Sequence, residues 1–146
     1  MLQLNVNNET SRLLAVVLGT AKSNGPDPML EDCYDPISRE NILANTYPIE
    51  IDMVDELNQL EEVLIKHNVN VYRPEVINDY NQIFSRDIGF VIDDFFVVAN
   101  ILPDRSNEIF AIQKVLDLIP KNKIIAGPYI FMTCQHQFFY HLPIFH

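Results

Sequence analysis

The most informative segment of this chain reads Phe84-Ser85-Arg86-Asp87-Ile88-Gly89-Phe90-Val91-Ile92-Asp93-Asp94. A second apolar run, Phe95-Phe96-Val97-Val98-Ala99, follows directly. Two β-rich runs around a two-residue polar break predict a β-hairpin, with strands near 88–92 and 95–99 and a turn at Asp93-Asp94. Arg86 and Asp87 lie where a loop enters the first strand. Side chains at such a position can face a site while the sheet holds them in place.

The residues before the hairpin predict two strands, a loop and a helix. Residues 13–18 form a short apolar run that ends at Gly19 and predicts a buried strand. Residues 20–48 are rich in glycine and proline, which predicts a long loop with at most a short helical turn. Apolar residues recur at spacings of three and four over 52–67, which predicts a helix with Asp52 as its N-cap. Residues 69–73 alternate in polarity and predict the second strand.

The residues after the hairpin predict one more helix and one more strand. A loop over 100–105 leads to Ser106 or Asn107, either of which can cap the helix. Pro120 ends the helix, and Lys123-Ile124-Ile125-Ala126-Gly127 predicts a strand. The order of strands and amphipathic helices indicates an α/β fold. The apolar positions of this helix are Ile109, Ile112, Val115, Leu116 and Ile119.

Composition limits the class of protein. The chain has 146 residues, enough for one domain, and its 48% hydrophobic content supports a buried core. Its net charge of −10 repels a phosphate backbone, so we expect no nucleic-acid partner, and it suits a cationic ligand or simple solubility. No apolar stretch reaches the ~20 residues that span a bilayer, and the first residues lack a signal-peptide pattern. We therefore expect a cytoplasmic protein without a membrane partner.

The last residues differ from the rest in composition. No carboxylate side chain follows Asp117, while aromatic residues and three of the four histidines gather in residues 129–146. Cys134-Gln135-His136 has the residue types of a thiolate with a nearby base, or of the start of a metal site. It lacks the second ligand pair that zinc needs and a third group to orient the histidine. We therefore expect Cys134 to be a small buried hydrophobe and expect no metal site.

Asp87 is the best candidate site residue on physical grounds. A carboxylate just before a buried strand must be solvated, paired or functional. The structural alternative is a salt bridge with Arg86 or a loop cap that uses nearby backbone amides. Both interpretations stay open from the residues alone.

The order of elements from residue 11 to residue 127 resembles the N-terminal part of the amidinotransferase and guanidino-group-modifying superfamily, the pentein fold. Arg86-Asp87 followed by Phe90-Val91-Ile92 is similar to the loop and strand that open that family's substrate cavity. The resemblance implies an α/β propeller of ββαβ modules, of which residues 1–128 would form a truncated, partial propeller. It also implies a cysteine that attacks the guanidinium carbon of arginine-like substrates, assisted by a histidine and a carboxylate, with no cofactor or metal.

On this resemblance Asp87 would bind the guanidino substrate, since a planar guanidinium matches a carboxylate through two parallel hydrogen bonds. Arg86 would position the loop or contact a substrate carboxylate. The family's other motifs are missing: no Glu-Gly-Gly-Asp-like segment follows Ile124-Ile125, and no His-x-Asp motif is present. Cys134 does not correspond to the family's nucleophile. We therefore expect Asp87 and Arg86 to be substrate-binding residues and assign no catalytic residue.

The sequence leads to one hypothesis and one functional alternative, and an unrelated small α/β domain without any site stays open as a third interpretation. The hypothesis is a truncated amidinotransferase-like protein, which acts on arginine or a related guanidino compound through a cysteine intermediate when complete and is inactive alone. The alternative is a noncatalytic acidic α/β module that binds a cationic small molecule or a protein partner. Transferase, deiminase and dimethylaminohydrolase chemistry stay open, as do the acceptor and the oligomeric state. Residues 129–146 are expected to be an aberrant tail from a reading-frame error or premature end, or else a real C-terminal strand.

Overall fold

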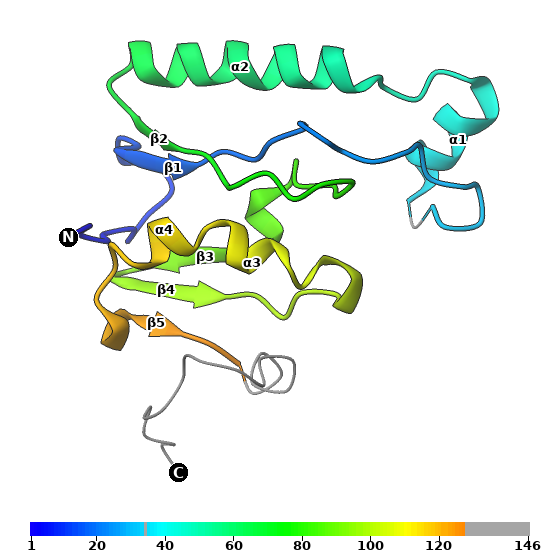
Figure 1. Cartoon of the computed structure of the whole chain (residues 1–146). Coiled ribbons are helices and arrows are strands. Elements are labelled where there is room, and N and C mark those ends of the chain that lie inside the picture. Colours follow the sequence, from blue (N-terminus) through cyan, green and yellow to red (C-terminus); the bar gives the residue numbers. More distant parts are fainter. Residues whose placement is uncertain (34, 128–146) are drawn as a thin grey trace.

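A computed structural model describes residues 1–33 and 35–127 of the chain (Figure 1). The predicted aberrant tail, with Cys134 and His136, lies outside these residues. The described part is a mixed α/β structure with two separate small sheets. In each sheet a helical crossover joins two parallel strands, as expected for α/β connections.

The first sheet pairs β1 (Ala15–Val17) with β2 (Asn70–Tyr72) in parallel. The crossover between them contains α1 (Pro36–Ala44) and α2 (Glu50–Lys66), and Figure 1 shows α2 running along the outer side of this sheet. Neither helix buries a side chain. The first strand was expected to be buried over 13–18. This expectation is wrong, because β1 is half-buried and Leu13 and Leu14 are exposed.

The second sheet contains the predicted hairpin. Strand β3 (Gly89–Ile92) pairs antiparallel with β4 (Phe95–Val98), with Gly89 opposite Val98 and Ile92 opposite Phe95. Asp93 adopts a left-handed backbone conformation with φ of 49°, which a tight two-residue connection requires. The hairpin prediction is therefore confirmed, including the turn at Asp93-Asp94.

The crossover that follows the hairpin returns the chain to the same sheet. It contains α3 (Glu108–Ala111) and α4 (Gln113–Leu116) and leads to β5 (Ile124–Ile125), which lies parallel to β4. The single helix predicted here is in fact two short segments, because Ile112 leaves helical geometry at φ −104° and ψ 14°. Short 3-10 turns connect the elements: η1 (Ser85–Asp87), η2 (Pro103–Arg105) and η3 (Lys121–Lys123).

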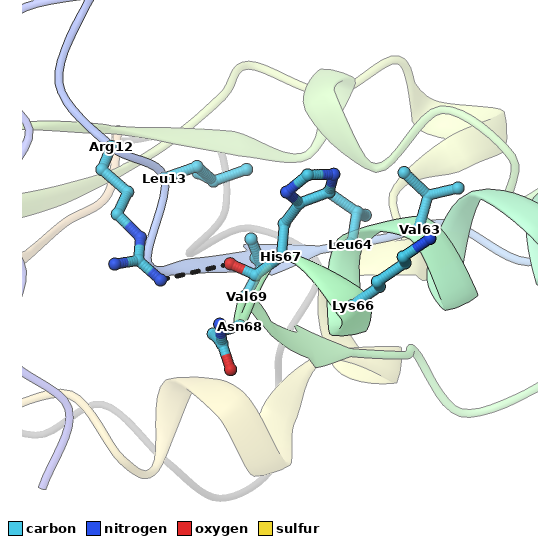
Figure 2. Close-up of a pocket in the computed structure, with 8 residues that line it drawn as sticks. All are labelled: Arg12, Leu13, Val63, Leu64, Lys66, His67, Asn68 and Val69. Carbon is cyan, nitrogen blue, oxygen red and sulfur yellow. Dashed lines mark hydrogen bonds between the residues drawn. The ribbon is translucent and has the colours of Figure 1, made fainter.

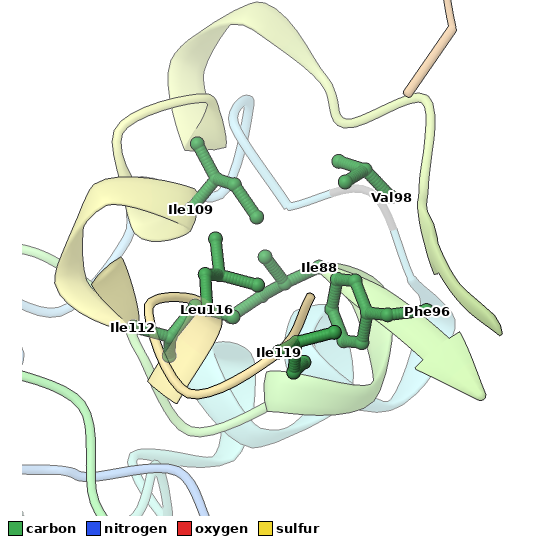
Figure 3. Packing of buried hydrophobic residues seen from close by; sticks show 7 residues of the cluster. All are labelled: Ile88, Phe96, Val98, Ile109, Ile112, Leu116 and Ile119. Carbon is green, nitrogen blue, oxygen red and sulfur yellow. The ribbon is translucent and has the colours of Figure 1, made fainter. Parts of the chain in front are cut away.

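One hydrophobic cluster joins α3 and α4 to the second sheet. Figure 3 shows its side chains converging between the helical segments and the strands. All five apolar positions predicted for the second helix are buried, so the predicted apolar face is confirmed although the helix is interrupted. The cluster consists of Ile88, Phe96, Val98, Ile109, Ile112, Leu116 and Ile119.

Two expectations about the first crossover need correction. The predicted loop over 20–48 contains the nine-residue helix α1, which begins with a cap because the Asp35 side chain accepts a hydrogen bond from the Ser38 amide at 2.8 Å. Pro36 fits the first helical turn, where no amide donor is needed. Helix α2 begins after Ile49, so Asp52 lies in its first turn and is not the cap. Asn68 follows α2 in a left-handed backbone conformation with φ of 59°, which is common after the end of a helix.

Candidate functional site around Asp87

Asp87 closes the 3-10 turn η1, directly before β3. The turn is fixed from both sides: the Ser85 hydroxyl donates to the Val17 carbonyl of β1 at 2.7 Å, and Ile88 is only 2% exposed in the core. The Asp87 amide donates to the Phe84 carbonyl at 3.0 Å. The backbone that carries the Asp87 carboxylate is therefore held by both sheets.

The connection before η1 depends on a buried glutamine. Gln82 is 1% exposed, and its side-chain amide donates to the Glu75 carbonyl at 2.9 Å and accepts from the Ile77 amide at 2.7 Å. Its backbone carbonyl accepts from the Thr20 amide at 3.0 Å. These bonds attach an otherwise irregular segment to the end of β1, which fixes the approach of the chain to Asp87.

Asp87 is one end of a charged network that continues through Arg105 to Glu108. Arg105, in η2, donates from Nη1 to Asp87 Oδ2 at 2.7 Å and from Nε to Glu108 Oε1 at 2.5 Å. Exposure falls along this chain of groups, from 46% for the Asp87 side chain to 24% for Arg105 and 0% for Glu108. The network therefore leads from the surface into the interior.

Burial and pairing act in opposite directions on these groups. Burial raises the pKa of Glu108 above its ordinary value, and the hydrogen bond and charge of Arg105 only partly oppose this. Burial by itself lowers the pKa of Arg105, but its bonds to Glu108 and Asp87 outweigh burial and raise that pKa. Glu108 Oε2 is buried and has no hydrogen-bond partner among the residues that the structure describes.

Arg86 has a smaller part in the site than the sequence suggested. Its Nε lies 3.8 Å from Asp87 Oδ1, its side chain is 82% exposed, and its guanidinium lies 5.4 Å from the centre of the Phe84 ring. An exposed pair at this distance contributes little. The structural alternative for Asp87, a salt bridge, is thus present, but its main partner is Arg105.

A helical-periodicity signal for this network exists in the sequence. Glu108 precedes Ile112 by four residues and therefore falls on the apolar face of the predicted helix. A carboxylate on such a face needs a buried cation, and Arg105 lies one helical turn before it. The link to Asp87, 18 residues away, depends on the tertiary fold.

A separate open cavity of about 560 Å³ lies at the C-terminal end of α2 (Figure 2). Arg12 lines it and donates from Nη2 to the His67 carbonyl at 3.2 Å. Asp87 is not among its lining residues, so this cavity is not the one that the resemblance implied. The lining residues are Arg12, Leu13, Val63, Leu64, Lys66, His67, Asn68 and Val69.

Other kinds of site receive no support from the described residues. Within residues 1–33 and 35–127, no group of three or more histidine, cysteine or acidic side chains is arranged to hold a metal ion. Cys33 is buried, and its thiol donates to the Met29 carbonyl at 3.4 Å. None of the helices in this part of the chain is long and apolar enough to cross a membrane.

The raised pKa of Glu108 predicts a pH dependence of folding. The folded protein binds this proton more tightly than the unfolded chain, so the stabilisation is complete below the ordinary value of 4.5 and is lost as pH rises through the raised folded pKa. Glu108→Gln cannot titrate, and we expect it to remove this part of the slope. Urea unfolding across a pH series measures it, and identical slopes in the two proteins would contradict the assignment.

Comparison with known proteins supports the fold. No family model and no curated protein matches the chain. Among solved structures it is similar to the inosamine-phosphate amidinotransferase StrB1 from Streptomyces griseus, with a TM-score of 0.63 and 20% identity over 86% of this chain and 43% of that one. It is also similar to SxtG, an amidinotransferase of the saxitoxin biosynthetic pathway from Microseira wollei, with a TM-score of 0.61 and 21% identity over 96% and 46%. The chain spans less than half the length of either structure.

Proposed function

We propose that this chain is the N-terminal part of an amidinotransferase-like protein and that Asp87 binds the guanidinium group of arginine or a related guanidino compound. Two findings support the proposal: the fold is similar to less than half of each of two amidinotransferase structures, and Asp87 is a half-exposed carboxylate on a turn that is bonded to β1. On this proposal the strand-strand-helix-strand unit from β3 to β5 is one propeller module. Amidino transfer or hydrolysis through a covalent cysteine would belong to the complete protein.

One observation favours the alternative of a noncatalytic binding module for the chain alone. His67 is the single histidine in the described part of the chain, and it lies at the cavity beside α2, which Asp87 does not line. The acid-base partner that guanidino chemistry needs is thus not near Asp87 among these residues. Binding of a cationic ligand needs only the carboxylate, so it is the part of the proposed function that this chain can be tested for.

The test is a titration with arginine, followed through the backbone amide signals of β3 and η1 in NMR spectra. We expect Asp87→Asn to weaken arginine binding about tenfold, because a charge-assisted hydrogen bond to a guanidinium contributes about 1.5–3 kcal/mol. Asp94→Asn is the matched control, since Asp94 belongs to the same hairpin and its side chain is 51% exposed in an ion pair with Lys123. Equal arginine affinity in the wild type and Asp87→Asn would refute the proposed function.

A further inference from the structure

The charged network around Arg105 contains two carboxylates but only one cation that contacts both of them. Arg105 carries a single positive charge and contacts both Glu108 and Asp87. The three groups together therefore keep one negative charge when both acids are ionised. Where this charge resides decides how strongly the network attracts a cation.

The difference in burial decides how the positive charge of Arg105 is divided between Glu108 and Asp87. Glu108 is 0% exposed, and Arg105 is its only hydrogen-bond partner among the described residues, since Oε2 has none. A buried carboxylate without a cation is strongly unfavourable, whereas the half-exposed Asp87 is also stabilised by water. Because Glu108 is fully buried and Asp87 is half-exposed, the Arg105 charge is committed mainly to Glu108.

We infer that Glu108 is a positioning residue that holds the charge of Arg105 and so leaves Asp87 with negative charge available to a guanidino ligand. This inference rests on the proposed function of Asp87. Arg86 does not replace Arg105 in this balance, because its guanidinium is 82% exposed and lies 3.8 Å from Asp87. Glu108 thus acts on the ligand through Arg105 and Asp87 without touching it.

Glu108→Gln tests the inference by removing one charge and keeping an acceptor oxygen for Arg105. Arg105 is then free to neutralise Asp87, and we expect arginine to bind about fivefold more weakly at neutral pH. Glu75→Gln is the matched control: it removes the same charge from the exposed pair with Lys114, and we expect no change in arginine affinity.

Arg105→Lys is expected to change arginine affinity in the opposite direction. It remains informative if Glu108→Gln fails to fold. A lysine ammonium is a point charge without the guanidinium fork, so it pairs with the buried Glu108 and leaves Asp87 free. We expect arginine to bind about twofold to threefold more tightly to this variant. A purely structural role of the network predicts weaker binding in both variants.

The outcomes separate the inference from the proposed function. If Asp87→Asn weakens arginine binding but Glu108→Gln does not, the inference is wrong and the proposed function stands. Weaker binding to Arg105→Lys also overturns the inference. If the wild type binds no arginine, or if Asp87→Asn binds it unchanged, the proposed function fails and the inference fails with it.

Discussion

Arg105→Ala is expected to destabilise the folded protein by about 3–5 kcal/mol, because it leaves Glu108 as a buried carboxylate without a cation. Glu108 is 0% exposed, and its Oε2 already lacks a partner among the described residues. Arg105 also donates to Asp87 at 2.7 Å and to the Phe84 carbonyl at 3.4 Å, so its loss removes two bonds to the segment around η1 as well. Urea unfolding monitored by circular dichroism measures the change.

Arg86→Ala is the matched control for this prediction. It removes the same side chain from a position 82% exposed, and we expect a change within about 0.5 kcal/mol. Equal stability of Arg105→Ala and Arg86→Ala would mean that Glu108 needs no cation. The network would then not be the buried ion pair that its distances indicate.

Gly19→Ala is expected to destabilise the protein by about 3 kcal/mol, because two backbone segments approach closely at Gly19. A Cβ atom there would lie 2.0 Å from the Ile83 carbonyl oxygen and 2.5 Å from that of Gln82. Both obstacles are backbone atoms, so no rotamer change relieves the overlap. The shift would also strain the bond from Arg73 Nη1 to the Gly19 carbonyl at 2.7 Å. Thermal unfolding measures the loss.

Gly127→Ala is the control for the glycine substitution. A Cβ at Gly127 meets no described atom within 4 Å, so the change in stability should be small. If Gly19→Ala is as stable as Gly127→Ala, then β1 and the segment around Gln82 do not approach as closely as described. The conclusion that β1 holds the turn η1 in place would then be wrong.

Local sequence signals account for the elements that were predicted well. Asp93-Asp94 between two apolar runs fixes the hairpin, because polar residues that tolerate a left-handed backbone favour a turn there. The apolar periodicity over 52–67 predicts most of α2, and Asn68, which tolerates a left-handed backbone, follows the end of that helix. These features depend on residues close in sequence, which is why they could be read without a structure.

Two features were not predicted, the helix α1 and the break at Ile112, because the local sequence pattern fits more than one structure at each. Helix α1 was hidden because proline content was read as a loop, although Asp35-Pro36 is also a helix start. The break at Ile112 leaves the apolar period intact, so periodicity could not reveal it.

In the candidate site, too, some features follow from the local sequence and others depend on the tertiary fold. Asp87 could be selected from its place before an apolar strand, but its partner Arg105 lies in a turn that the sequence marks only as a loop. Glu108 carried a readable signal, as an acid on the apolar face of a helix. Its pairing with Asp87 through one arginine follows from how the hairpin and the crossover pack together, which no local pattern contains.

The most direct test of the central claim, that Asp87 binds a guanidinium, is a crystal structure of this chain with arginine. The account predicts a guanidinium group within hydrogen-bond distance of the Asp87 carboxylate, with Arg105 still bonded to Glu108. Arginine bound elsewhere, for example in the cavity beside α2, with Asp87 paired to Arg105 alone, would contradict it.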